Sequence, residues 1–217
     1  KLFIGFLTTA AFLVTSPQPA AQQPVNGRKS LVFENAAARL VVDLGGGAIG
    51  AFQFKTDAIN PLNWGTPQPG DTAVRGFGHF LCLDRWGPPS EAEGARGMPY
   101  HGEAANVAWQ IEKDVSVQNG AHEGRMSAKL PLAGLSIKRT IRMSPSAAVF
   151  TVREEIKNEN PLGRIYNAVQ HPTIGPPFLT EHTLVDCNGR RGFAQGGTLP
   201  NPEEDRKSTR LNSVTVR

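Results

Sequence analysis

The run Leu135-Ser136-Ile137-Lys138-Arg139-Thr140-Ile141-Arg142-Met143 has an apolar residue at every second position except Arg139. That alternation is the period of a β-strand with one face in the core and one face in water. Other short runs rich in β-branched or aromatic residues, separated by turn residues, lie at 30–34, 38–44, 49–54, 108–112, 126–130 and 148–156. No segment keeps a 3.6-residue period for three turns. The sequence therefore predicts an all-β fold, an antiparallel β-sandwich.

A glycine-rich segment, Gly45 to Gly50, satisfies the spacing G-x-G-x-x-G directly after a strand-like run. A dinucleotide site with this motif requires a helix next, because the helix N-terminus receives the pyrophosphate. Here the following residues, Ala51 to Phe54, alternate in the manner of a strand. We therefore interpret the glycines as a hairpin turn with positive φ angles.

The first residues of the chain have the layout of a secretory signal peptide. Residues 1–21 combine Lys1, an apolar run from Leu2 to Val14 and an exit of small residues. The run is shorter than the roughly 20 residues that cross a bilayer. We expect residues 22–29 to form a linker and the protein to be exported, periplasmic or secreted, with no membrane partner after cleavage of the signal. An uncleaved membrane anchor is the alternative.

The last residues have a different origin in our interpretation. Asp205 to Ser213 resembles, residue for residue, the conceptual translation of a common sequencing-adapter oligonucleotide. We interpret residues 205–217 as an artefact of that kind and exclude them from the fold. Residues 30–204 are then the N-terminal part of the β-sandwich, which we expect to be incomplete at its C-terminus.

The net charge of +4 lies at the two ends of the chain. Residues 205–217 contribute +3 and Lys1 contributes the remaining charge, so residues 2–204 are neutral overall. These residues contain no run of Lys and Arg with interleaved aromatics. A nucleic-acid partner is therefore not expected.

The chain contains two cysteines and five histidines. Cys82 and Cys187 could form a disulfide in an exported protein, but both have strand-like flanks that suit a buried free thiol equally well. His101-Gly102-Glu103 has the H-x-E of zinc deaminases without their P-C-x-x-C pair. No two histidines have the spacing of a helical or zinc-finger site, so no metal and no cofactor are predicted, although a looser histidine site stays open.

The segment from Arg75 to Glu103 is rich in aromatic, charged and glycine residues. Within it, Arg85 and Trp86 precede a Glu- and Gly-rich loop that leads to His101. Aromatic rings stack on the apolar face of a pyranose, and charged side chains bind its hydroxyl groups. The segment therefore predicts a site for a small-molecule sugar. Ordinary core aromatics and a surface ion pair are the alternative interpretation.

Three motifs, in this order, resemble the aldose 1-epimerase family, whose fold is the galactose mutarotase-like supersandwich. The motifs are Asn60-Pro61-Leu62-Asn63-Trp64, the H-G-x6-W run from His101 to Trp109, and Gln170-His171-Pro172. The resemblance spans about residues 30–186. It implies an isomerase that interconverts the α and β anomers of a free sugar, with His171 as the general acid and His101 as a second catalytic histidine. The substrate-binding positions that we assign are Arg85, Trp86, Glu103, Trp109 and Gln170.

Mutarotation requires an acid at the ring oxygen and a base at the anomeric hydroxyl, and histidine titrates in the range that suits the acid. The base of the family is a carboxylate near the C-terminus, and no residue of this chain matches it. The residues after His101-Gly102 lack the arginine of members that act on sugar phosphates, which argues against a phosphorylated substrate. Two further hypotheses are a non-catalytic carbohydrate-binding β-sandwich, or accessory domain of a polysaccharide-acting enzyme, and an exported sandwich with an unrelated role.

Overall fold

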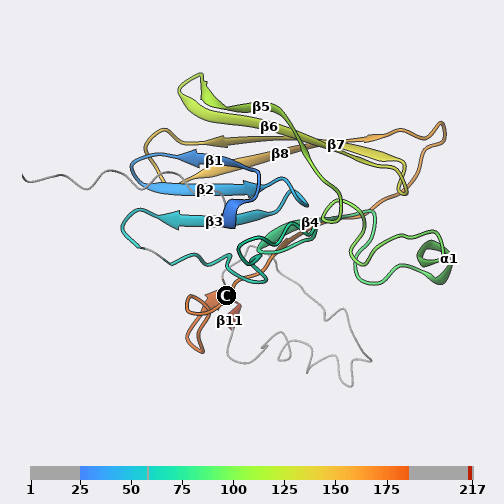
Figure 1. Cartoon of the computed structure of the whole chain (residues 1–217), viewed down its shortest axis with the longest axis horizontal. Helices are drawn as coiled ribbons and strands as arrows, with labels where there is room; N and C mark the ends of the chain where they lie inside the picture. The colour runs from blue at the N-terminus through green and yellow to red at the C-terminus, as the bar shows by residue number, and fades with distance from the viewer. Residues whose placement is uncertain (1–24, 58, 186–214, 217) are drawn as a thin grey trace, which may run out of the picture.

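The structure is a computed structural model that describes residues 25–57, 59–185 and 215–216. Two antiparallel sheets pack face to face, so the prediction of an all-β sandwich is confirmed (Figure 1). The helical elements of the described residues are two short ones, η1 (Val25–Gly27) and α1 (Glu91–Gly94). No helix in these ranges is long and apolar enough to cross a membrane.

The larger sheet has five strands in the order β1-β2-β3-β4-β9, and the smaller has four in the order β5-β6-β7-β8. The five-stranded sheet consists of β1 (Ser30–Glu34), β2 (Ala38–Asp43), β3 (Ile49–Phe54), β4 (His79–Leu83) and β9 (Ala168–Pro172). The four-stranded sheet consists of β5 (Gln110–Gln118), β6 (Ala121–Leu130), β7 (Leu135–Met143) and β8 (Phe150–Asn158). Neighbouring strands in the two sheets are consecutive in the chain except β4 and β9. All four strands of the smaller sheet come between these two in the sequence.

A separate two-residue ladder lies outside both sheets. Here β10 (Leu184–Val185) pairs in parallel with β11 (Thr215–Val216). The rest of the segment interpreted as an artefact, the predicted signal peptide and Cys187 lie outside the described residues. Cys82 is described and is fully buried, and burial raises the pKa of its thiol to about 11.

The alternation in β7 sets the packing of the two sheets. Its odd-numbered residues are buried and its even-numbered residues face water. Arg139 follows this rule, because its side chain is only 3% exposed although it is charged. The core between the sheets includes the apolar side chains Leu31, Phe33, Leu40 and Val42 from one sheet and Met126, Ile137, Ile141 and Met143 from the other.

The glycine-rich segment is a hairpin turn between β2 and β3, as its sequence indicated. Gly46 and Gly47 have φ angles of 116° and 65°, which side chains with a Cβ rarely adopt. A Cβ on Gly47 would lie 2.5 Å from the indole of Trp109. The turn therefore also packs directly against the Trp109 side chain.

The five-stranded sheet is covered on both faces, whereas the four-stranded sheet is covered on one. Phe80 and Cys82 of β4 belong to a second buried cluster, with Ala48, Phe77 and Ala105, that is separate from the core between the sheets. Phe77 and Ala105 lie in the long connections that follow β3 and β4, and Ala48 lies in the turn before β3. Loops therefore pack on the outer face of the sheet, and the candidate site lies between these loops and the sheet.

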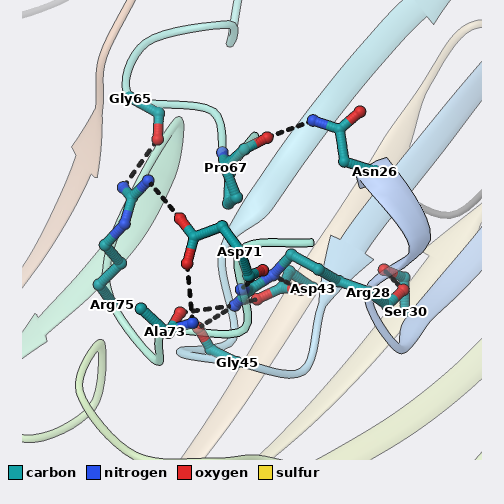
Figure 2. A network of polar contacts seen from close by, with 10 residues as sticks. All are labelled: Asn26, Arg28, Ser30, Asp43, Gly45, Gly65, Pro67, Asp71, Ala73 and Arg75. Atoms are coloured by element: carbon teal, nitrogen blue, oxygen red, sulfur yellow. Dashed lines mark hydrogen bonds and ion pairs between the residues drawn. The ribbon is translucent and has the colours of Figure 1, made fainter. Parts of the chain in front are cut away.

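A buried arginine fastens the first of these connections to the sheet (Figure 2). Arg28 donates to both carboxylate oxygens of Asp43, at 2.9 and 3.1 Å, and to the backbone oxygens of Asp71 and Ala73 at 2.7 and 2.9 Å. Arg75 extends the network, since it donates to Asp71 and to the backbone of Gly65. The hydrogen bonds to Asp43 raise the pKa of the Arg28 guanidinium. Because these N–H groups are engaged within the protein, we assign this network a structural role.

Candidate functional site

The pairing of β4 with β9 places His171 on the outer face of the five-stranded sheet. His171 lies directly opposite Phe80, and the two rings stack with centroids 4.5 Å apart. Side chains of consecutive strand residues point to opposite faces. Gln170 accordingly points toward the four-stranded sheet, where it donates to Glu154 at 2.7 Å.

The connection after β4 returns to the outer face of the five-stranded sheet and places His101 there. Its return is fixed by a parallel bridge between Leu83 and Gly102. A Cβ on Gly102 would lie 2.2 Å from the backbone oxygen of Leu83, and the φ angle there is 77°. Only glycine fits this approach. His101, one residue earlier, has a φ of 65°, an uncommon conformation for a residue with a side chain.

The result is a group of five rings, here called the histidine cluster: Phe80, Trp86, Tyr100, His101 and His171. The ring centroids of His101 and His171 are 5.5 Å apart, although the residues are far apart in the sequence. Trp86 lies 4.7 Å from His101 and 5.2 Å from His171. The ring centroids of Tyr100 and His101 are 4.1 Å apart in a T-shaped arrangement. Both histidines are half-buried, so the structure brings the two candidate catalytic residues together at a partly open position.

His101 is held by two hydrogen bonds to one residue. Its backbone N–H donates to the oxygen of Gly87 at 3.0 Å, and the N–H of Gly87 donates to Nδ1 of its ring at 3.0 Å. An Nδ1 atom that accepts carries no proton, so the proton of the neutral ring is on Nε2. Burial lowers the pKa of His101, and the neighbouring His171 lowers it further.

The same contact bears on metal binding. A metal-ligating histidine uses a bare nitrogen and donates its other ring N–H to an acceptor. The Gly87 contact fixes the opposite arrangement at His101, with the bare nitrogen already occupied. Within the described ranges, no three His, Cys, Asp or Glu side chains form a group that could hold a metal ion.

Arg85 directly precedes Trp86 of the histidine cluster and makes its ion pair within the same loop. It forms an ion pair with Glu93, and Glu93 also accepts from the backbone of Ser90 in a capping box at the start of α1. The hydrogen bonds from Ser90, and then that from Arg85, lower the pKa of Glu93 to about 2. The Nε of Arg85 is buried and has no hydrogen-bond partner in the part of the chain that the structure describes.

Three other predicted ligands make contacts away from the two histidines, and two of them, Glu103 and Trp109, are buried. Glu103 is 3% exposed and accepts the backbone N–H of Ala133 at 2.7 Å. The indole of Trp109 donates to the oxygen of Ala104 at 2.8 Å. Gln170 faces the other sheet, as described above. The structure therefore brings Trp86 to the two histidines, pairs Arg85 with Glu93 in the same loop, and gives Glu103, Trp109 and Gln170 contacts elsewhere.

A second polar group lies between the sheets, and sequence reasoning missed it. We call it the polar relay: Arg139, Glu154, Gln170 and His79. Arg139 pairs with Oε1 of Glu154 at 2.6 Å, Oε2 of Glu154 accepts from Gln170, and Oε1 of Gln170 lies 3.0 Å from Nε2 of His79. Arg139 also lies 4.4 Å over the ring of Trp109. The one charged residue at an apolar position of the β7 alternation was the signal that could have revealed it.

No protein-family model, no curated protein and no solved structure matches this chain.

Proposed function

We propose that this protein is an aldose 1-epimerase-like isomerase that interconverts the anomers of a free sugar. The observation that supports this proposal is the contact between His101 and His171, whose ring centroids are 5.5 Å apart, with Trp86 next to both. Two imidazoles at this distance can both reach one sugar ring. Trp86 and the exposed Tyr100 offer aromatic surfaces on which a pyranose can stack.

The two histidines differ in what they can do. His101 keeps a neutral ring with its proton on Nε2, so it donates a hydrogen bond to the sugar and does not lose that proton. His171 is the general acid: it gives its Nε2 proton to the ring oxygen, which opens the ring. A base takes the proton of the anomeric hydroxyl as the C1 aldehyde forms. Reclosure on the other face of C1 completes the change of anomer.

One observation favours the alternative of a non-catalytic carbohydrate-binding β-sandwich. In the described residues, no carboxylate forms an ion pair with His101 or His171, and none contributes to the pKa shift of His101. A binding module needs the aromatic rings and hydrogen-bond donors of the histidine cluster, and it needs no base. The two functions therefore differ in whether a base completes the site.

Polarimetry on a panel of free aldoses tests the isomerase. We expect His171→Ala to lower the rate of mutarotation by about 100-fold, the usual scale for the loss of a general acid. His101→Ala should cost a similar factor if its hydrogen bond strengthens in the transition state. His182→Ala is the matched control, because that side chain is 86% exposed and contacts neither ring.

Unsubstituted protein that accelerates none of the aldoses contradicts the isomerase. Calorimetric titration with the same sugars then tests the binding module. In that case Trp86→Ala should weaken binding by about 10-fold or more, the scale of one aromatic stacking surface.

A further inference from the structure

The partners of the two Nδ1 atoms differ in kind. His101 faces the backbone N–H of Gly87, which can only donate. His171 faces the hydroxyl of Thr173, with Nδ1 and Oγ1 3.0 Å apart. A hydroxyl can donate or accept, because its proton rotates. Only one of the two rings therefore has a partner that suits both a protonated and an unprotonated Nδ1.

This difference decides which ring can exchange a proton at low cost. Protonation of His101 at Nδ1 would turn the Gly87 contact into two donors facing each other, and it would place a positive charge beside the ring of His171. Protonation of His171 needs only a rotation of the Thr173 hydroxyl, which then accepts from Nδ1–H. A hydrogen bond to a charged group is worth about 1.5–3 kcal/mol.

We propose that Thr173 is a positioning residue that lets His171 change its protonation state while its ring stays in place. The inference rests on the proposed function, in which His171 is the general acid. The imidazolium gives its Nε2 proton to the ring oxygen, and the electron pair of the C1–O bond passes to that oxygen. A carboxylate or water takes the anomeric proton as C1=O forms. The neutral ring that remains carries its proton on Nδ1, where Oγ1 accepts it.

The backbone around Thr173 is well anchored for this role. The N–H of Thr173 donates to the oxygen of Gly78 at 2.9 Å. A Cβ on Gly78 would lie 2.6 Å from the oxygen of Ile49, so that residue is tightly packed against β3. Two residues after Thr173, the N–H of Gly175 donates to the oxygen of Pro61 at 3.0 Å. The hydroxyl can therefore rotate while its oxygen keeps its distance from the ring.

Nitrogen NMR of the imidazoles tests the proposal without any sugar, because the ¹⁵N shifts report which ring nitrogen carries a proton. The variants His101→Gln and His171→Gln assign the signals. We expect Nδ1 of His101 to be bare while the Gly87 contact holds. We expect His171 to pass from one bound proton to two as the pH falls.

Thr173→Val removes the hydroxyl at nearly constant volume. We expect the midpoint of the His171 titration to fall by about one pH unit, because the charged ring loses its acceptor. Thr173→Ser should restore the midpoint, and Thr151→Val on the exposed face of β8 should leave it unchanged. If Thr173→Val does not fold, Thr173→Ala replaces it.

Two results would overturn the inference: an unchanged His171 midpoint in a folded variant without the hydroxyl, or a proton on Nδ1 of His101 in the unsubstituted protein. Failure of the isomerase proposal looks different. In that case the NMR results are as expected, while polarimetry finds no accelerated mutarotation. If the protein is an isomerase, Thr173→Val should also lower kcat more than it raises KM, and Thr173→Ser should recover kcat.

Discussion

The two faces of the five-stranded sheet carry two groups of aromatic and ionisable side chains that are built in opposite ways. In the polar relay, on the inner face, each charged or amide group is paired with another. In the histidine cluster, on the outer face, both histidines are half-buried, and within the described residues each uses only Nδ1 for a hydrogen bond to the protein. Consecutive residues supply both groups, since His79 and Gln170 point inward while Phe80 and His171 point outward. The relay is suited to join the sheets, and the cluster is suited to meet a ligand.

Substitution of Glu154 should have the largest effect on stability. It should disrupt the polar relay, which is suited to join the sheets, and leave the histidine cluster intact. Glu154→Gln leaves the guanidinium of Arg139 buried without a counter-charge. We expect the free energy of unfolding to fall by about 3–5 kcal/mol, the usual cost of breaking a buried ion pair. Urea denaturation measures the loss, while ¹⁵N shifts of the histidine cluster should change little.

The adjacent residue supplies the control for this substitution. Glu155 points to water and pairs with Arg153, and both side chains are more than half exposed. Glu155→Gln should cost less than about 1 kcal/mol, as exposed pairs do. The double substitution Arg139→Met with Glu154→Leu should recover much of the stability that Glu154→Gln loses. Equal losses in Glu154→Gln and Glu155→Gln would remove the distinction between the two faces.

Gly102→Ala should have the next largest effect, and it should act on the histidine cluster. The new Cβ would collide with the backbone oxygen of Leu83 in a conformation that already disfavours it. We expect a loss of about 2–4 kcal/mol in the free energy of unfolding, from conformation and overpacking together, and a displaced His101 signal. Gly97→Ala has a similar positive φ in the same loop with nothing within 4 Å of the new Cβ, so it should cost only about 1–2 kcal/mol. A similar cost for both would mean that the Leu83 contact does not position the loop.

The smallest effect should appear in the pH dependence of stability. Burial lowers the pKa of His79 and of His101 in the folded protein, one histidine on each face. As the pH falls below about 6.5, the unfolded chain binds protons at these positions before the folded protein does. The free energy of unfolding should therefore decrease from about pH 6.5 down to the lowered folded pKa values, and then level off. His79→Gln and His101→Gln, measured by urea denaturation at several pH values, should each remove part of this slope. A slope that neither variant changes would assign it to other groups.

Three strands were predicted to the residue, and the others only in part. The predicted ranges 30–34, 49–54 and 135–143 coincide with β1, β3 and β7. The hairpin of β5 and β6 was predicted only in part, because most residues from Lys113 to Gly124 are polar and apolar residues do not alternate throughout the range. Its turn, Asn119-Gly120, has positive φ at both residues and was a usable signal.

The candidate site was also predicted only in part. The resemblance carried His101 and His171, and the structure places them in contact. Gln170 and Trp109 were grouped with them because they belong to the same motifs of the resemblance. In a strand, however, the residue next to an outward-facing one points inward, so Gln170 joined the relay. The positions of Glu103 and Trp109 depend on how the long loops pack over the sheet. No local sequence pattern predicts that packing.

The bridge between Leu83 and Gly102 also makes the loop from residue 84 to residue 101 a closed ring on the surface. Its two ends meet at the sheet, and its far side carries the exposed residues around Gly97. Doubling the length of such a loop costs only about 0.6 kcal/mol of closure entropy. The tip can therefore accept an inserted peptide or a label while His101 keeps its position. The protein thus offers a scaffold in which the rim of the site can be redesigned separately from its histidines.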